Sequence, residues 1–268
     1  MEGSYYDELD RIFTQAAPIY DKKIGSNFIN LAIREKEIDA IVKRCRSGQK
    51  LLEIGCGTGE EASKIMRATG CTIVCVDISL GMLKFAQSKM KERGFSNKFV
   101  PLRMPAYSIG SMKGKFEIVY SFNGALNNEP NIKSFFNGLT EVIEDGGYFI
   151  TSIRNRYSLS EALLAMLTAN ARRLSERMMG EVNVEVVGNN VRSHYFTDAE
   201  FLRLLPGSFS LEERIGLGIF VLPSLYERFV MRRLEGLVTK LEGTFYKLPP
   251  LNYLGDETLF VFRKRVLG

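Results

Sequence analysis

Several features are scarce in this chain of 268 residues, and each scarcity narrows the kind of protein it encodes. No apolar run approaches the roughly 18 residues that a membrane-spanning helix requires, so we expect no membrane span. The first residues lack the basic-then-apolar layout of a secretory signal peptide, and we therefore expect a cytoplasmic protein. The four cysteines form no C-x-x-C pair and the single histidine, His194, has no cysteine beside it, so we expect reduced thiols and no metal site.

An excess of charge of one sign is also lacking. The chain has 36 basic residues (Lys and Arg) against 31 acidic ones, a formal net charge of +5, and the basic residues are scattered. Scattered charges favour solvated helix faces over a nucleic-acid surface, so we expect no nucleic-acid partner. No prediction of the oligomeric state follows from the sequence.

What the sequence does contain is an alternation of strand and helix patterns. Short apolar runs predict strands at residues 50–54, 71–79, 98–104, 115–122 and 147–153. The segments between them carry apolar residues at helical spacing, and the last of these helices ends at Gly146 and Gly147. Such alternation gives right-handed crossovers and a mostly parallel sheet with helices on both faces.

The flanking segments follow other patterns. An apolar helical stripe over residues 28–45 predicts a helix before the first strand. After Arg154 we expect a helix at 158–179, a hairpin at 181–196, a helix at 198–205 begun by a Thr197-x-x-Glu200 capping box, a strand at 209–221, a helix at 223–241 and a strand at 258–264. These patterns divide the chain into a helical cover (1–46), a core (47–155), a helix-and-hairpin cap (156–196) and a C-terminal part of the core sheet with a substrate-side helical insertion (197–268).

The stretch LLEIGCGTGEEA joins the first expected strand to the next helix. Glycine-rich turns of this kind usually bind phosphate at the helix N-terminus. Glu60 and Glu61 in the first helical turn would oppose a phosphate but would accept a cationic ligand, and S-adenosylmethionine is such a ligand because its sulfonium and ammonium outweigh its carboxylate. The spacing of Gly55, Gly57 and Gly59 also differs from the G-x-G-x-x-G of nicotinamide sites, so a nicotinamide dehydrogenase is disfavoured.

LLEIGCGTG followed by VCVDIS resembles motif I and its successor in class I S-adenosylmethionine-dependent methyltransferases, over roughly residues 10 to 155. The resemblance implies a Rossmann-like, doubly wound, mostly parallel seven-stranded α/β sheet with an antiparallel last strand, plus a helical and hairpin cap. It implies that the core at 47–155 binds the cofactor, that the three glycines let the backbone approach its methionine portion, and that Glu53 fixes the loop and favours the ammonium. Asp77 would accept hydrogen bonds from the ribose hydroxyls, its alternative being a helix cap.

The resemblance implies further cofactor contacts. Ile78 and Met82 would flank the adenine, and Tyr20 would fold over the cofactor, the alternative being a surface aromatic that packs on the core. The other expected contacts are Cys56, Thr58, Met104, Pro105, Ser121 and Phe122. The family commonly has an acidic residue after the third strand, where this chain has VPLRMPAYSIG, so a group near Met104 would have to replace it.

Candidates for acceptor binding and catalysis lie further along. SFNGALNN follows the fourth strand, where ligands bind in such sheets, and it lacks the Asn/Asp-Pro-Pro-Tyr motif of methyltransferases that act on nucleobase or glutamine amino groups. Asn123 and Asn127 are candidate contacts to substrate or cofactor, or turn asparagines. His194 is a candidate general base, or a structural residue beside the helix cap, and methyl transfer often needs no base.

The segments 158–195 and 221–256 are rich in Leu, Met, Phe and Tyr, which suggests an apolar acceptor pocket or simple packing of the cap onto the sheet. We therefore expect an S-adenosylmethionine-dependent methyltransferase acting on a small, partly apolar molecule. The alternative is a non-catalytic, S-adenosylmethionine-binding regulatory or interaction protein.

Overall fold

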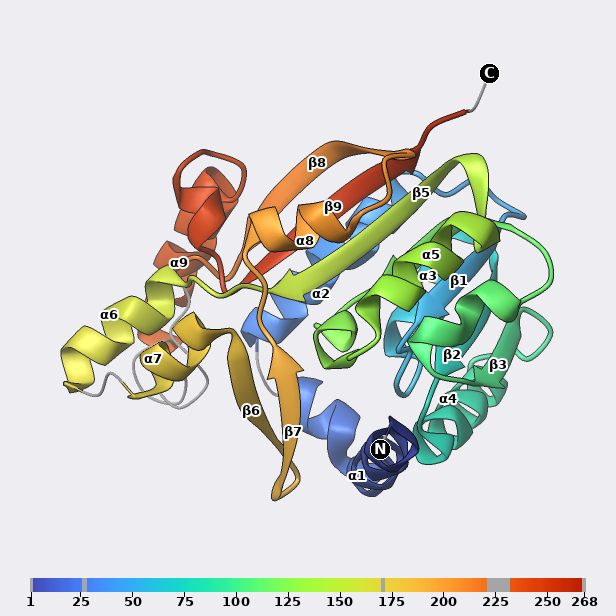
Figure 1. Ribbon diagram of the computed structural model, residues 1–268, viewed down its shortest axis with the longest axis horizontal. Helices are drawn as coiled ribbons and strands as arrows, with labels where there is room; N and C mark the ends of the chain where they lie inside the picture. Colours follow the sequence, from blue (N-terminus) through green and yellow to red (C-terminus); the bar gives the residue numbers. More distant parts are fainter. Residues whose placement is uncertain (1, 26–27, 170–171, 221–231, 267–268) are drawn as a thin grey trace.

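The computed structural model describes residues 2–25, 28–169, 172–220 and 232–266, which contain a seven-stranded sheet of order β3-β2-β1-β4-β5-β9-β8 (Figure 1). The strands are β1 Lys50–Ile54, β2 Thr72–Asp77, β3 Phe99–Arg103, β4 Phe116–Ser121, β5 Ile143–Arg154, β8 Phe209–Leu217 and β9 Glu257–Lys264. The first five are parallel, and β9 pairs antiparallel with both β5 and β8. The predicted mostly parallel seven-stranded sheet with an antiparallel last strand is confirmed.

Helices cover both faces of this sheet. One face carries α2 Phe28–Val42, α3 Glu60–Thr69 and α4 Leu80–Glu92, and the other carries η1 Ala106–Ser111, α5 Ile132–Val142 and α8 Asp198–Leu204. The four central residues of β2 are all apolar because they pack on both faces of the sheet. Ile73 and Cys75 pack against the first layer of helices, and Val74 and Val76 pack against the second. A strand that is buried on both faces has no polar side to expose.

Helix α1 (Glu2–Gly25) and the hairpin of β6 (Glu181–Val186) and β7 (Asn189–His194) lie beyond the end of the sheet to which β1 and β5 point (Figure 1). α1 packs so closely on α4 that a Cβ at Gly81 would lie only 2.7 Å from the Cα of Thr14. Ligands bind at the carboxyl ends of the strands in open α/β sheets. α1 and the hairpin therefore flank the region where a ligand is expected.

The cap differs from the prediction in one respect. The single helix expected at 158–179 is two helices, α6 (Leu159–Thr168) and α7 (Arg172–Met179). Ala169 ends α6 with a left-handed φ of 50°, which breaks the helical path. Arg177 of α7 then reaches the carboxylate of Asp256 at 2.7 Å. The predicted hairpin and the Thr197 capping box are confirmed.

The C-terminal part of the chain includes a further helix and a short helix before β9. Residues 221–231 lie outside the described residues, so the helix predicted at 223–241 is described from residue 232 only, as α9 (Arg232–Phe245). The short η2 (Ala125–Asn128) follows β4, and η5 (Leu251–Leu254) precedes β9. Among the helices described here, none is both long and apolar enough to cross a bilayer.

Candidate functional site

The turn from β1 to α3 holds its three glycines in the left-handed region, with φ of 70° at Gly55, 51° at Gly57 and 71° at Gly59. Residues with a Cβ rarely adopt this conformation. Position 55 requires glycine for a second reason, since a Cβ there would lie 2.5 Å from the Cβ of Ala125. At Gly57 the nearest atom to such a Cβ is Cε1 of Tyr20, at 3.9 Å. The turn thus presents bare backbone to a space that Tyr20 borders.

Asp77, the last residue of β2, links this turn to α4. One carboxylate oxygen accepts a hydrogen bond from the backbone N–H of Gly57 at 2.8 Å, and the other accepts one from that of Ser79, also at 2.8 Å. Burial raises the pKa of Asp77 to about 6, and these two hydrogen bonds oppose the rise. An ionised carboxylate has about four acceptor sites, so two remain for a ligand.

A cavity opens along the carboxyl ends of the strands from β3 to β4. It offers about 130 Å³ of space to the centre of a water-sized sphere. Met104 and Ile78 line it after β3 and β2, the glycine turn lines its middle, and Asn123 lines it after β4. Side chains from α1 and α2 complete the wall, Tyr20 among them.

The two acidic residues at the start of α3 face different surroundings. Glu60 does not line the cavity; it pairs with Lys89 at 3.1 Å and Arg93 at 3.0 Å, and these cations outweigh its burial and hold its pKa below the usual range. Glu61 is 5% exposed, lines the cavity and pairs with Arg34 of α2 at 2.8 Å. The negative charge at this turn is therefore presented to the cavity by one residue and not by two.

Most of the predicted cofactor contacts come together in this cavity. The predicted residues that line it are Tyr20, Gly55, Cys56, Gly57, Thr58, Asp77, Ile78, Met82, Met104, Pro105, Phe122 and Asn123. Burial, and then the charge of Glu61, raise the pKa of Tyr20 to about 12, so its phenol stays protonated. The expectation that a residue near Met104 borders the ligand agrees with this geometry.

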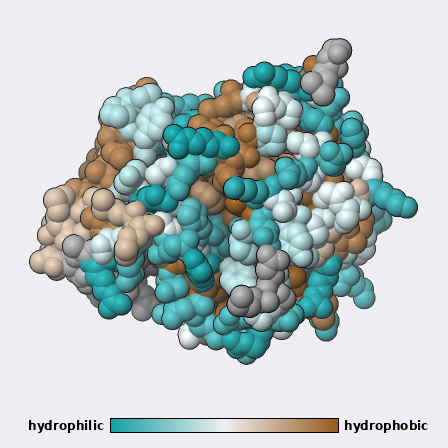
Figure 2. Space-filling view, in the orientation of Figure 1, coloured by the Kyte–Doolittle hydropathy of each residue, from teal (hydrophilic) through white to brown (hydrophobic). Residues whose placement is uncertain are grey.

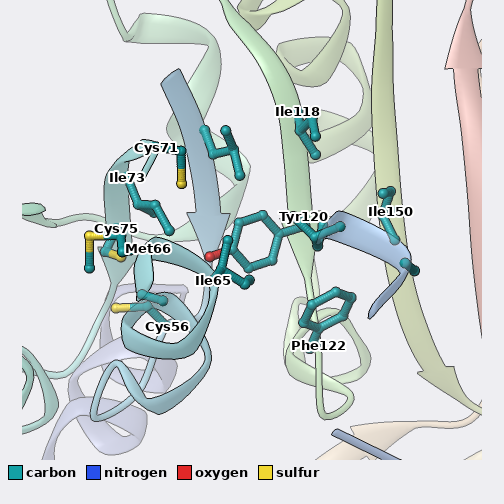
Figure 3. Close-up of a cluster of buried hydrophobic side chains, with 14 of the residues drawn as sticks. Cys56, Ile65, Met66, Cys71, Ile73, Cys75, Ile118, Tyr120, Phe122 and Ile150 are labelled. Atoms are coloured by element: carbon teal, nitrogen blue, oxygen red, sulfur yellow. The ribbon is translucent and has the colours of Figure 1, made fainter. Parts of the chain in front are cut away.

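Glu53, Gly59 and Ser121 do not line the cavity. Glu53 faces the sheet interior, where Cys75 donates a hydrogen bond to it, and burial raises its pKa well above the usual value. Ser121 donates to the carbonyl of Ile54 at 3.0 Å, and a Cβ at Gly59 would meet α4. Figure 3 shows this interior, with Tyr120 reaching across β1 and the Cys56 side chain lying near Met66 and Cys75. Cys56 therefore borders the cavity while its side chain belongs to the core.

Asn127 and His194 also lie outside the cavity lining. The Asn127 amide donates to the carbonyls of Arg154 and His194 and its oxygen accepts from the Arg154 N–H, so it joins β5 to β7. His194 lines a neighbouring groove, with Nδ1 2.9 Å from Glu181 and Nε2 4.0 Å from Glu200. The wall between this groove and the cavity includes Glu129, which lines both.

The structure adds cavity residues that the sequence analysis missed. Tyr6, Leu9 and Phe13 line the cavity from one face of α1, where their spacing of three and four residues was the available signal. Arg34 was visible as a charge within the apolar stripe of α2. Glu129 accepts hydrogen bonds from the Tyr6 hydroxyl and from the backbone N–H of Tyr107, and so brings an acidic group to the cavity near Met104. In the part of the chain described, no group of three or more potential metal ligands occurs.

Comparison with known proteins identifies a methyltransferase domain in the chain. Residues 51–147 match the family model of a methyltransferase domain. An uncharacterised protein of Methanocaldococcus jannaschii is 31% identical over 175 residues, 65% of this chain and 60% of its own length. A ubiquinone/menaquinone biosynthesis C-methyltransferase of Coxiella burnetii is 25% identical over 149 residues, 54% of this chain and 58% of its own length. The chain thus spans about 60% of the length of these relatives.

Solved structures show the same fold. An S-adenosylmethionine-dependent methyltransferase from Clostridium acetobutylicum superposes with a TM-score of 0.60 at 14% identity, covering 93% of this chain and 98% of its own. Residues 51–147 thus match a methyltransferase domain, and the fold of the chain is that of a solved S-adenosylmethionine-dependent methyltransferase. The matched domain supports S-adenosylmethionine as the cofactor.

Proposed function

We propose that the protein transfers the methyl group of S-adenosylmethionine to a small, partly apolar acceptor. The observation that carries the proposal is the joint placement of Gly57, Asp77 and Glu61 around one cavity. When bound, the cofactor supplies an electrophilic methyl group on a sulfonium. The residues of the chain bind it, orient it and keep water away.

The side chains present fit the parts of the cofactor. Asp77 retains acceptor capacity for two ribose hydroxyls after accepting from Gly57 and Ser79. Arg34, whose side chain is 4% exposed, and Glu61 offer a cation and an anion side by side, which match the carboxylate and the ammonium of the methionine portion. Ile78 and Met104 offer apolar surface for the adenine, with Glu129 close by.

The chain contributes to transfer mainly by positioning. A methyl transfer from a sulfonium is an in-line displacement, so holding the acceptor close and aligned lowers the barrier without a proton transfer. Tyr20 and Phe13 of α1 border the cavity and exclude water from it. Asn123 follows β4 and is the polar group that we place nearest the transferred methyl.

The apolar character of the acceptor rests on two observations. Leu9, Phe13 and Phe122 line the cavity. The cap exposes further apolar side chains, and Figure 2 shows tan to brown residues on the side of the molecule where α6 and α7 lie; they include Leu163, Met166, Met178 and Met179. The relative from Coxiella burnetii is named for quinone biosynthesis, which is consistent with such an acceptor.

Titration calorimetry with S-adenosylmethionine tests the cofactor site. Asp77→Ala removes an ionised acceptor that organises the turn and meets the ribose, so we expect affinity to fall at least about 30-fold, or roughly 2 kcal/mol. Equal affinity of the variant and the wild type would contradict the proposal. Release of S-adenosylhomocysteine with a panel of small acceptors then separates an enzyme from a non-catalytic cofactor-binding protein, since only the enzyme turns over.

A further inference from the structure

A buried carboxyl group lies directly behind the cofactor cavity and has no part in the function described so far. Glu37 of α2 is 0% exposed and does not line the cavity. One of its oxygens accepts hydrogen bonds from the Ser152 hydroxyl of β5 and from the backbone N–H of Asn123, the latter at 3.4 Å. The same Asn123 N–H also approaches the Ser152 oxygen at 3.0 Å.

Asn123 is the residue that this arrangement constrains. Its φ is 55°, in the left-handed region, which asparagine adopts more readily than most other non-glycine residues, and it lies between β4 and η2 on the cavity wall. Its side-chain amide, through Nδ2, donates a hydrogen bond to Glu61 at 3.0 Å. Asn123 is therefore held at its backbone by Glu37 and Ser152, and at its side chain by Glu61.

The second oxygen of Glu37 is buried and has no hydrogen-bond partner among the described residues. The same holds for one oxygen of Glu257, which is 4% exposed and pairs with Arg154 through its other oxygen at 3.2 Å. Burial, and next the charge of Glu257, raise the pKa of Glu37 well above the usual value. A protonated Glu37 accepts at one oxygen and carries its proton on the other, which is the pattern that a glutamine side chain reproduces.

From this geometry we propose that Glu37 is a positioning residue that holds Asn123 in its left-handed conformation against the cofactor cavity. The role of Asn123 at the cofactor rests on the proposed function, whereas its conformation does not. Glu37 and Ser152 hold the Asn123 backbone N–H from the interior, and these contacts select its left-handed conformation at the cavity wall. Apolar replacement of Glu37 leaves the Asn123 N–H with Ser152 alone and leaves the Ser152 hydroxyl without its acceptor.

Two variants separate positioning from general destabilisation. Glu37→Met removes the acceptor at similar length, and we expect it to weaken binding of S-adenosylmethionine, measured by calorimetry, at least tenfold. Glu37→Gln keeps the acceptor and places a donor on the second atom, so we expect affinity within about threefold of wild type. Phe201→Leu is the matched control: this fully buried side chain on the opposite face of the sheet should lower thermal stability without changing affinity.

Crystal structures of the same variants test the inference independently of cofactor binding. We expect Asn123 to keep a positive φ in Glu37→Gln and to relax to a negative φ in Glu37→Met. An unchanged Asn123 in Glu37→Met, or equal affinity of that variant and wild type, overturns the positioning role. A loss of affinity in Glu37→Gln equal to that in Glu37→Met overturns the neutral-acceptor role. Failure of the wild type to bind S-adenosylmethionine would instead contradict the proposed function, and the φ comparison would still decide the role of Glu37.

Discussion

The cofactor-binding core and the cap are held in place by different interactions. In the core, β1, β2 and β4 bury apolar side chains on both faces, and charges sit at the strand ends. In the cap, alternate residues of β6 are exposed. The cap meets the rest of the chain through a few buried apolar side chains, Val191 and Phe196 among them, and through ion pairs centred on Arg177 and Asp256. The comparison teaches that the part proposed to bind the cofactor is packed like a domain interior, whereas the part that would meet the acceptor combines a few apolar contacts with specific polar ones.

Arg177→Ala should give the largest effect and should act on the cap. Arg177 is 3% exposed, donates to the Asn155 carbonyl at 2.8 Å and pairs with Asp256 at 2.7 Å. Removing one partner of a buried ion pair costs about 3 to 5 kcal/mol. Because the Asp256 side chain is 25% exposed and keeps its pair with Arg154, we expect a loss at the lower end of this range, about 3 kcal/mol. Urea unfolding should show this loss, and limited proteolysis should cut first within the cap.

Arg192→Ala is the matched control for this prediction. Arg192 also pairs with an acid in the cap, Glu181 at 2.6 Å, but its side chain is 72% exposed. Exposed pairs contribute little, so its unfolding curve should overlay that of the wild type. If both variants behave alike, ion pairing does not attach the cap and the contrast with the core is lost.

A pair of glycine substitutions sharpens the description of the core. Gly55→Ala adds left-handed strain of about 1 to 2 kcal/mol and an overlap with Ala125 of about 1 to 3 kcal/mol, so we expect a loss of about 2 to 5 kcal/mol in unfolding free energy. Gly57→Ala adds the strain alone, because its Cβ has space up to Tyr20. Gly57→Ala should nevertheless weaken cofactor binding, since its Cβ enters the cavity. Equal stability of the two variants would mean that the turn adjusts and that Ala125 sets no limit.

These contrasts explain how much was predictable from the sequence. The strands, the glycine turn, Asp77 and the hairpin depend on neighbours in the chain, and they were found to within a few residues. The pairing of Glu60 with Lys89 and Arg93 was not, because α4 brings the cations from about thirty residues further along. The ion pair that holds α7, between Arg177 and Asp256, joins residues that are remote in sequence. Arg34 and Glu37 left a signal, two charges in an apolar helical stripe, whose partners only the fold identifies.

The pH dependence of cofactor binding should report on Asp77. Its pKa is raised to about 6 in the folded protein because it is buried, and ribose hydroxyls favour its ionised form. Binding therefore releases a proton near this pH, and affinity should rise as the pH increases through about 6 and stay level above it. Below that point the loss approaches tenfold per pH unit at most. Asp77→Asn should remove the dependence, and an affinity that rises on acidification would contradict the assignment.

Substitution of His194 should have the smallest effect on turnover, and it tests where in the molecule the methyl transfer occurs. The imidazole lies in the groove between Glu181 and Glu200, outside the cavity lining, so it does not border an acceptor placed beside Asn123. We expect His194→Gln to change turnover by less than about threefold, because the transfer itself requires alignment more than proton removal. Turnover with an acceptor found by screening would be measured from pH 5 to 8, with Asn123→Ala as the comparison that should lose much more. A loss above tenfold in His194→Gln would make His194 the general base and would place the acceptor on the cap side of Glu129.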